Sequence, residues 1–417
     1  MNCYKIEGGQ KLCGKVTVHG SKNAALPILA ASIINGGINL IHNCPFLSDV
    51  DSIIEILEFL GCRVCRNARD VTVDSSSFKL RDIPSGAMCC TRASTLFAGA
   101  LLARCGRAFI AGSGGCSIGK RPIDMHLKAF KTMGYSIFFA DGGVLCTGKQ
   151  KNDAKVILDF PSVGATENIM LAASSYKGTT HICNAAREPE IQNLADFLRS
   201  IGCVISGDGT GEIYITGTES PTDSHIDIIP DRIVAATYAS AVACAGGKIE
   251  ICGIKPSLVY PFCDILGDIG ISVCQRPDGF TVEKIRRCKC IGKLSTAPYP
   301  GFPTDCQPLI VASLATADGV SVVEETVFEN RFGHCNRLVL MGADIRISGS
   351  EATIRGVKRL HGAHTDACDL RCGAALAVAA LGADGYTYLG KTEYIERGYE
   401  NLLADLKTHG AAIESID

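Results

Sequence analysis

The sequence predicts an α/β protein of two domains, each built from three copies of one repeating unit. Its 417 residues exceed what one hydrophobic core usually serves, so two domains are expected. Helix-like apolar stretches alternate with short β-like runs along the chain. A hydrophobic residue or histidine followed by glycine closes six of these helical stretches, with the glycines at positions 61, 134, 202, 270, 342 and 410. Consecutive glycines are 68 to 73 residues apart, and such a regular period indicates six copies of one unit.

Each copy contains the same elements in the same order. A helix of small apolar residues comes first, as in 23–31 or 235–243, and it should be buried because it is apolar on all sides. A glycine-rich turn and a strand follow, as in 246–251. The next helix is amphipathic, as in 191–198, and its closing glycine is a C-cap signal. A β-hairpin completes a βαβαββ-like unit, and we expect the buried helices inside each domain with the sheets around them.

The predicted domains are residues 22–229, and residues 1–21 together with 230–417. The break near Ile229-Pro230-Asp231 divides the six copies evenly. Residues 1–21 resemble a strand hairpin that lacks a helix of its own, and the last copy ends abruptly at Asp417. The N-terminal segment is therefore expected to complete the last copy.

Composition excludes several classes of protein. A formal net charge of −2 gives no reason to expect nucleic acid or an anionic membrane as a partner. No apolar run approaches the roughly 20 residues that cross a bilayer, and residues 1–5 lack the layout of a signal peptide, so a cytoplasmic protein is expected.

The 22 cysteines lie mostly inside apolar runs, which in a reducing compartment indicates core packing. Cys62-x-x-Cys65, Cys288-x-Cys290 and His361-x-x-His364 have no second ligand pair at zinc spacing, so no structural metal is expected.

A glycine-rich stretch, residues 112–126, carries the most chemistry. Its four glycines in eight residues read as a loop, and Cys116 lies near Lys120 and Arg121. A cationic neighbourhood stabilises thiolate, and Pro122 opens an amphipathic helix. A thiol, two cations and a helix N-terminus together suit an anionic substrate. The alternative, a glycine hairpin whose cysteine is a small apolar filler, stays open at this point.

Two glycine patterns imitate nucleotide-binding motifs. Residues 114–120 match GxxxxGK, but Arg121 follows where a P-loop needs Ser or Thr for magnesium. Residues 207–211, GDGTG, lie between the strand-like runs 204–206 and 213–215, which predicts a hairpin turn instead of a dinucleotide site.

Charged residues recur where the helices of the copies begin. Capping explains the aspartates among them. It does not explain the cations, which oppose the helix dipole at an N-terminus: Lys22, Arg92, Arg121, Arg331, Arg371 and Arg397. A strongly anionic ligand shared among helix ends would account for them, so we predict a phosphate- and carboxylate-binding cleft between the two domains.

Eight motifs that span the chain carry a resemblance to a known family. They are GSKNAALP at 20–27, the loop around Cys116 with RPID at 121–124, PSVGATEN at 161–168, AREPE at 186–190, FPTD at 302–305, FENRF at 328–332, DLR at 369–371 and RGYE at 397–400. Together and in this order they resemble the UDP-N-acetylglucosamine enolpyruvyl transferases.

This resemblance implies the enolpyruvyl transferase fold, an inside-out α/β barrel in two domains, with the N-terminal strands joining the C-terminal domain. It also implies transfer of the enolpyruvyl group of phosphoenolpyruvate to the 3-hydroxyl of UDP-N-acetylglucosamine with release of phosphate, the first committed step of peptidoglycan synthesis. The implied partners are these two small molecules, without nucleic acid or membrane, and no cofactor is implied.

The family's functional residues transfer by motif. Cys116 would be the general acid and Asp305 the acceptor of the sugar hydroxyl's proton, and Lys22 and Arg397 would also serve catalysis. Lys22 and Asn23 would bind phosphoenolpyruvate, with Arg121, Arg371 and Arg397 neutralising its phosphate and carboxylate. The nucleotide sugar would be held by Arg92, Arg121, Pro122, Ile123, Asp124, Met125, Ser162, Val163, Gly164, Asp305 and Val327. Arg331 and Asp369 complete the substrate-binding set.

The sequence departs from the family pattern at Thr91, Ser113, Tyr394 and Glu396. These changes leave the charged contacts in place, with one Asp lengthened to Glu, and they bear on rate and loop rigidity more than on reaction type. Two alternatives remain. One is a divergent paralogue that binds the nucleotide sugar with little turnover, and the other is the sister enzyme that acts on shikimate 3-phosphate, which shares the fold but lacks the cysteine loop.

Overall fold

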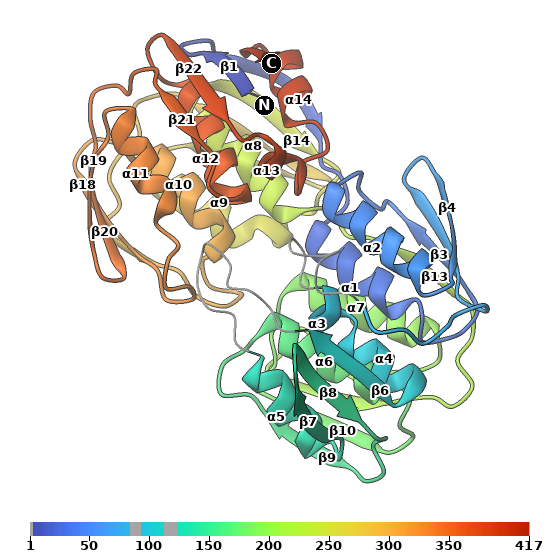
Figure 1. Cartoon of the computed structure of the whole chain (residues 1–417). Coiled ribbons are helices and arrows are strands. Elements are labelled where there is room, and N and C mark those ends of the chain that lie inside the picture. Colours follow the sequence, from blue (N-terminus) through green and yellow to red (C-terminus); the bar gives the residue numbers. More distant parts are fainter. Residues whose placement is uncertain (1–2, 84–92, 112–122, 417) are drawn as a thin grey trace. The chain divides into compact units, whose positions relative to one another are not determined.

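The computed structural model of the chain describes residues 3–83, 93–111 and 123–416. These residues form two compact units (Figure 1). Unit 1 contains residues 3–19 and 230–416, and unit 2 contains residues 20–83, 93–111 and 123–229. The chain passes from one unit to the other between residues 19 and 20 and between residues 229 and 230.

Unit 2 contains the two kinds of helix that the repeat predicts. The apolar helices are α1 (Lys22–Ala31), α4 (Ala98–Cys105), which follows the short α3 (Ala93–Leu96), and α6 (Val163–Ala173). The amphipathic helices are α2 (Ser48–Phe59), α5 (Asp124–Thr132) and α7 (Pro189–Ser200). Residues 165–173 of α6 are all buried, as expected of a helix that is apolar on all sides.

Three sheets belong to unit 2. The first has the order β13 (Ser224–Asp227), β3 (Ile38–His42), β5 (Asp70–Asp74), β4 (Arg63–Asn67). The second has the order β11 (Val204–Ser206), β12 (Glu212–Thr216), β10 (Thr179–Cys183), β9 (Ala154–Ile157). The third has the order β6 (Arg107–Ala111), β8 (Gly143–Thr147), β7 (Ser136–Ala140). Strands β11 and β12 pair antiparallel around residues 207–211, which confirms the predicted hairpin turn.

Unit 1 repeats this plan. Its apolar helices α8 (Arg232–Ala245), α10 (Gln307–Leu314) and α12 (Leu370–Leu381) contact one another. Figure 1 shows β18 (Val320–Glu324) and β22 (Tyr386–Gly390) outside these helices, which confirms the inside-out arrangement for this unit. The other helices are α9 (Pro256–Asp268), α11 (Gly333–Leu340), α13 (Glu393–Glu396), α14 (Leu402–Thr408) and the 3₁₀ turn η2 (Thr304–Cys306).

Unit 1 also has three sheets. The first has the order β15 (Ser272–Arg276), β16 (Gly279–Lys284), β14 (Gly247–Cys252), β2 (Leu12–Thr17). The second has the order β17 (Lys293–Ser295), β18, β20 (Glu351–Arg355), β19 (Asp344–Ser348). The third has the order β21 (His364–Asp366), β22, β1 (Cys3–Glu7), β23 (Ala412–Ile416). Strand β1 pairs with both β22 and β23, so it completes the last copy as predicted. The predicted N-terminal hairpin is wrong, because β2 pairs with β14 in a different sheet.

Two strands belong to one unit although the helix that follows each of them in the sequence belongs to the other. Strand β2 precedes α1 of unit 2 in the sequence, but it pairs in parallel with β14 of unit 1. Strand β13 precedes α8 of unit 1, but it pairs in parallel with β3 of unit 2. Each of the two chain crossings therefore follows a strand that stays with the unit that the chain is leaving.

The six repeat glycines all adopt a left-handed backbone conformation. Their φ angles are 85° at Gly61, 95° at Gly134, 106° at Gly202, 89° at Gly270, 87° at Gly342 and 103° at Gly410. Residues with a Cβ are strained there, whereas glycine is not. The C-cap prediction is confirmed, and each glycine turns the chain from an amphipathic helix into the next strand.

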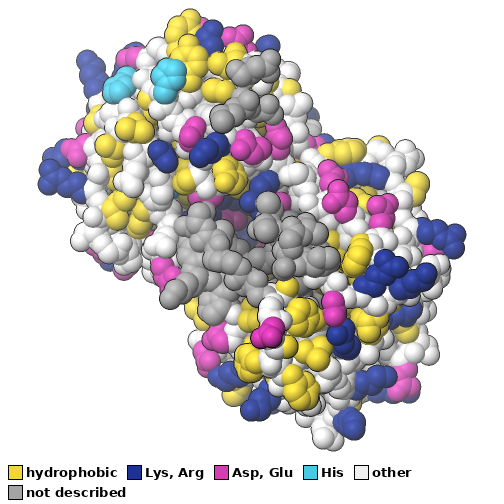
Figure 2. Space-filling model, in the orientation of Figure 1, with side chains coloured by type: hydrophobic (Ala, Val, Ile, Leu, Met, Phe, Trp, Pro, Cys, Tyr) yellow, Lys and Arg dark blue, Asp and Glu magenta, His cyan; other side chains and the backbone are white. Residues whose placement is uncertain are grey.

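Each unit has its own hydrophobic core. All nineteen cysteines in the described part of the chain are free thiols, and ten of them are buried. No helix among the described residues is long and apolar enough to cross a membrane. Figure 2 shows cationic and anionic side chains mixed over the face that it draws, in keeping with the small net charge.

Candidate active site

Asp305 in unit 1 is held between two arginines. Arg331 donates a hydrogen bond from Nη2 to Asp305 Oδ1 at 2.7 Å, and Arg371 donates from Nη2 to Oδ2 at 2.9 Å. The two arginine side chains are only 3% and 5% exposed, whereas that of Asp305 is 28% exposed. The structure thus brings together three of the predicted site residues, with the carboxylate as the most accessible member.

Helix starts bring these three side chains together. Asp305 lies in η2, immediately before α10. Arg371 lies in the first turn of α12, where the side chain of Asp369 caps the helix by accepting hydrogen bonds from the N–H groups of Arg371 at 2.8 Å and Cys372 at 3.0 Å. Arg331 lies two residues before α11. Because α10 contacts both α11 and α12, residues at these starts meet.

The charges in this cluster fix each other's protonation states. Burial alone would raise the pKa of the Asp305 carboxyl, but Arg371 and Arg331 hold that pKa well below its usual range. Burial in turn would lower the pKa of Arg371, but Asp305 raises it. Burial, together with the charge of Arg331, lowers the pKa of His334 to about 4. Near neutral pH the cluster therefore contains an anionic Asp305, two cations and a neutral His334.

A buried carboxylate, Glu325, joins two segments of this region. Its Oε2 accepts a hydrogen bond from Thr304 Oγ1 at 2.9 Å, directly beside Asp305. Its Oε1 accepts hydrogen bonds from the backbone N–H groups of Val327 at 2.9 Å and Phe328 at 3.1 Å. Glu325 is 4% exposed. It fixes Asp305 and Val327, two predicted binding residues, relative to each other, and the sequence analysis did not identify it.

In unit 2 the predicted residues 123–125 and 162–164 lie at the adjacent N-terminal ends of α5 and α6. The Ser162 hydroxyl caps α6 by accepting a hydrogen bond from the N–H of Ala165 at 3.4 Å. Asn168 Nδ2 lies 3.2 Å from the Gly164 carbonyl oxygen and 3.2 Å from His126 Nδ1, so it links the two helices. Ile123 and Met125 are half-buried and Asp124 is exposed.

Lys22 opens α1 and has a partner that the sequence analysis did not predict. Its ammonium group forms an ion pair with Asp49 of α2, and both side chains are largely buried, at 11% and 4% exposure. Asn23, the next residue, is half-buried. An anionic substrate at Lys22 would therefore share this cation with a carboxylate of the protein.

The structure corrects the helix-dipole argument for one cation. Arg397 is the C-cap of α13, and α14 begins only at Leu402 with Asn401 as its N-cap. A cation at a helix C-terminus is favourable, so Arg397 does not oppose a dipole as expected. Arg331 and Arg371 do lie at helix N-termini, where their charges are unfavourable to the helix dipole, and their ion pairs with Asp305 offset this cost. Arg92, Cys116, Arg121 and Pro122 lie outside the described residues, as do Thr91 and Ser113.

The buried carboxyl group of Glu167, in unit 2, has an unusual pKa. Glu167 in α6 is 6% exposed, and burial followed by the charges of Glu190 and Glu188 raises its pKa to about 8. The sequence analysis did not single out these glutamates. Strongly shifted pKa values are frequent at functional sites. The spacing of the three glutamates in the sequence does not reveal the burial that raises the pKa of Glu167.

Comparison with known proteins shows the family of the chain. The family described as EPSP synthase (3-phosphoshikimate 1-carboxyvinyltransferase) matches residues 6–406. UDP-N-acetylglucosamine 1-carboxyvinyltransferase 2 of Caldanaerobacter subterraneus is 48% identical over 416 residues, and the protein of the same name from Carboxydothermus hydrogenoformans is 43% identical over 418 residues. Both matches cover 100% of each chain.

The chain belongs to the UDP-N-acetylglucosamine 1-carboxyvinyltransferase family. It is accordingly a transferase. A third relative, UDP-N-acetylglucosamine 1-carboxyvinyltransferase of Lawsonia intracellularis, is 42% identical over 409 residues, which cover 98% of each chain.

Solved structures support the fold. The enolpyruvyl transferase NikO from Streptomyces tendae matches with a TM-score of 0.89 and 24% identity over 99% of this chain and 98% of that one. EPSP synthase from Acinetobacter baumannii matches with a TM-score of 0.75 and 19% identity over the whole of both chains. The predicted enolpyruvyl transferase fold is confirmed.

Proposed function

We propose that the chain transfers the enolpyruvyl group of phosphoenolpyruvate to the 3-hydroxyl of UDP-N-acetylglucosamine and releases phosphate. The printed names of its relatives support this substrate pair. The observation that carries the proposal is the accessible Asp305 carboxylate between two buried arginines, because the reaction needs a base beside groups that bind anions. A cytoplasmic location and a role in peptidoglycan synthesis, and through it in cell shape and division, belong to this proposal.

The proposed reaction is an addition followed by an elimination. In the addition, the sugar oxygen bonds to C2 of phosphoenolpyruvate, its proton passes to Asp305, and Cys116 gives a proton to C3. In the elimination, C3 returns a proton to the Cys116 thiolate and the bond from C2 to the phosphate oxygen breaks, which restores the double bond. The released phosphate takes the proton held by Asp305, so both groups return to their starting states. An acid and a base are both needed, and cations stabilise the leaving phosphate.

The binding roles divide among the predicted residues. Residues 123–125 and 162–164, at the adjacent starts of α5 and α6, would hold the nucleotide sugar together with Arg92, Arg121 and Val327. Phosphoenolpyruvate would be bound by Lys22, Asn23, Arg121, Arg371 and Arg397. Arg331 and Asp369 would support Asp305 and Arg371, in keeping with the contacts that they make in unit 1.

The Asp305 cluster also suggests how the base is activated. As long as both arginines bind it, the Asp305 carboxylate is a weak base, because its pKa lies well below the usual range. A substrate phosphate or carboxylate competes for the same guanidinium groups. When it draws one of them away, the pKa of Asp305 rises and the carboxylate becomes a better proton acceptor. Substrate binding would thus prepare the base.

Phosphate release tests the proposal. The full chain is incubated with phosphoenolpyruvate, with and without UDP-N-acetylglucosamine, alongside Cys116→Ala and the control Cys65→Ala, which changes an exposed thiol of β4. We expect release only with both substrates, its loss in Cys116→Ala and its persistence in Cys65→Ala. Binding of the nucleotide sugar without release would contradict the transferase proposal, and release with shikimate 3-phosphate in place of the sugar would contradict the substrate assignment.

A further inference from the structure

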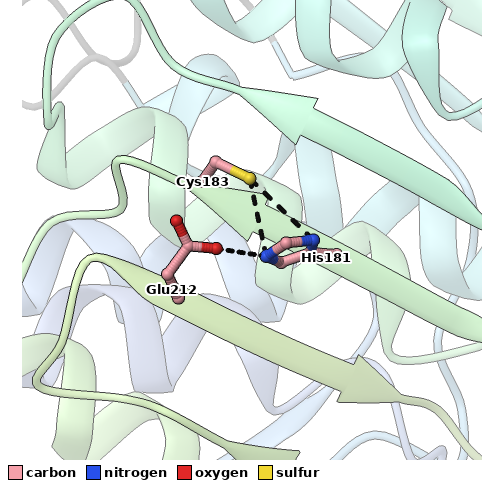
Figure 3. A group of neighbouring side chains, drawn as sticks. All are labelled: His181, Cys183 and Glu212. Atoms are coloured by element: carbon pink, nitrogen blue, oxygen red, sulfur yellow. Dashed lines mark hydrogen bonds and ion pairs between the residues drawn. The ribbon is translucent and has the colours of Figure 1, made fainter.

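A histidine, a cysteine and a glutamate meet on one sheet of unit 2, outside the proposed substrate site. His181 and Cys183 lie two residues apart on β10, so both point to the same face of the sheet (Figure 3). Glu212 lies on β12, directly opposite Cys183 in the antiparallel register. Thr180 and Ile182 of β10 face the core and are buried, which leaves the three side chains on the outer face.

The three functional groups converge on one point. His181 Nε2 contacts Glu212 Oε2 and lies 3.5 Å from Cys183 Sγ. Their ligand atoms all lie within 4.8 Å of one another. A catalytic thiol–imidazole–carboxylate relay needs the thiol and the carboxylate on opposite ring nitrogens. Here both approach Nε2, and the Nδ1–Sγ distance is longer, 3.9 Å, so the arrangement favours a shared centre over a relay.

The imidazole is held in place from the side. The ring of His181 stacks on Tyr214, its cross-strand partner on β12, with centroids 4.2 Å apart and an angle of 10° between the planes. The His181 side chain is 18% exposed and that of Glu212 is 55% exposed. The site is thus preformed at the histidine and open at the carboxylate, which allows an ion and a water molecule to enter.

The donor atoms select a class of metal. Nitrogen, sulfur and oxygen together suit Zn²⁺, whereas Mg²⁺ and Ca²⁺ prefer oxygen ligands alone. Tetrahedral zinc with ordinary bond lengths places its nitrogen and sulfur ligands about 3.6 Å apart. The Nε2–Sγ distance of 3.5 Å is close to that edge. Because Sγ also lies 3.9 Å from Nδ1, the thiol is beside the ring, and both the Cys183 thiol and the Glu212 carboxylate must shift to surround an ion at Nε2.

We propose that His181 Nε2, Cys183 Sγ and the Glu212 carboxylate form a Zn²⁺ site with water as the fourth ligand. On binding, three protein–zinc bonds form and the hydrogen bond between His181 and Glu212 breaks. The proton that Nε2 donates in that hydrogen bond leaves to water, the ring keeps one proton on Nδ1, and the thiol proton of Cys183 leaves to the buffer. Lys155 on β9, beside His181 in the parallel register, is the nearest cation in this sheet and is not one of the ligands. The site joins β10 to β12 and is independent of the proposed reaction.

Zinc titration of the full chain tests the site. The reduced, chelator-treated protein is titrated with Zn²⁺ in competition with a chromogenic chelator, together with Cys183→Ser, Glu212→Gln and His181→Phe, which keeps an aromatic ring on Tyr214. The control is Cys65→Ser on β4, and Cys116→Ser is titrated in parallel because a reactive thiol can also bind zinc. We expect the affinity for Zn²⁺ at the proposed site to fall at least tenfold in the three cluster variants. It should stay unchanged in Cys65→Ser and Cys116→Ser.

Substitution of Co²⁺ identifies the cysteine. Thiolate-to-cobalt charge-transfer absorption should appear in the natural chain and in both control variants and should be absent in Cys183→Ser. Zn²⁺ should also raise the melting temperature of the natural chain more than that of Glu212→Gln, because the ion binds the folded state. Cobalt absorption that persists in Cys183→Ser, or zinc affinity equal in natural and cluster-variant chains, would overturn the proposal whether or not the chain releases phosphate.

Discussion

Arg371 donates a hydrogen bond to Asp305 across 66 residues of sequence. The bond joins the starts of two buried helices, α10 and α12, that belong to consecutive copies of the repeat. The repeat places equivalent helix starts side by side, and the proposed chemistry uses charges at these starts. The first prediction follows from this contact.

Asp305→Asn should strongly destabilise the chain. The substitution keeps the shape of the side chain but leaves two buried guanidinium groups without their counter-ion, which typically costs about 3 kcal/mol. Urea denaturation measures the loss in the free energy of unfolding. Asp318→Asn is the matched control, because Asp318 is 82% exposed and lies 3.9 Å from Arg287, so its loss should stay below about 1 kcal/mol. Equal losses in the two variants would show that the Asp305 cluster is not a buried charge network.

Glu167→Gln should make stability less dependent on pH. In the unfolded chain this carboxyl ionises above about pH 4.3, whereas in the folded chain its pKa is about 8. Between these values the unfolded state has released the proton and the folded state has kept it, so stability falls as pH rises, by up to about 1.4 kcal/mol per unit. Glutamine cannot ionise, so the free energy of unfolding of Glu167→Gln does not decrease with pH for this reason.

The measurement for Glu167 is urea denaturation at several pH values from 5 to 8. The difference in unfolding free energy should shift steadily in favour of Glu167→Gln as pH rises. Glu58→Gln, at an exposed position of α2, provides the control and should show no such trend. A constant difference between natural chain and Glu167→Gln would mean that the carboxyl is already ionised in the folded state.

Glu325→Gln should impair the proposed reaction by displacing Asp305. An amide has one acceptor oxygen, which keeps the bonds from the Val327 and Phe328 N–H groups because these groups can only donate. Thr304 then loses the carboxylate oxygen that accepts its hydrogen bond, at a cost of up to about 2 kcal/mol. A loss of that size in transition-state stabilisation lowers kcat/KM more than tenfold. Thr304→Val removes the same hydrogen bond from the other side.

Steady-state kinetics of the two single variants and the double variant make the test for Glu325. If the carboxylate acts through Thr304, the double variant should lose less than the two single losses combined. Fully additive losses would show that the two residues act separately.

The repeat glycines can be tested with a matched pair. Gly134→Ala should cost about 1–2 kcal/mol, because φ is 95° there and an added Cβ meets nothing within 4 Å, which leaves backbone strain as the only penalty. Gly267→Ala in α9 also adds a Cβ in open space, but at a helical φ, and should stabilise by about 0.5–1 kcal/mol. Thermal unfolding of both variants checks the sign, and a stabilised Gly134→Ala would refute the C-cap role.

The repeat, the hairpin at 207–211 and the role of strand β1 could be predicted from the sequence, whereas the place of β2 could not. Each rests on a local rule: a glycine at a helix end, a glycine-rich turn between two strand-like runs, or a copy that lacks a strand. The pairing of β2 with β14 and of β13 with β3 has no local signature. It depends on which sheet offers a free edge, and that is decided by packing along the whole chain.

The candidate site was predicted residue by residue from motifs, but the supporting contacts were not. Glu325 directly follows a strand, and nothing in its neighbours shows that it is buried or that Thr304 reaches it. Asp49 pairs with Lys22 from another helix, and Glu212 joins His181 and Cys183 from another strand. Such partners are distant in sequence, so spacing rules miss them. Arg397 was misplaced because α13 is too short for its end to be predicted.

The pairing of β1 and β2 with strands far along the chain means that the two units can complete their sheets at different times during synthesis. All three sheets of unit 2 use strands from residues 20–229, so this unit can fold on the ribosome as soon as that segment has emerged. Strand β1 must wait much longer, because Tyr4 pairs with Ser415, and β2 waits for β14. Strands β1 and β2 therefore leave the ribosome well before their partners, and until then the nascent chain presents two unpaired strands.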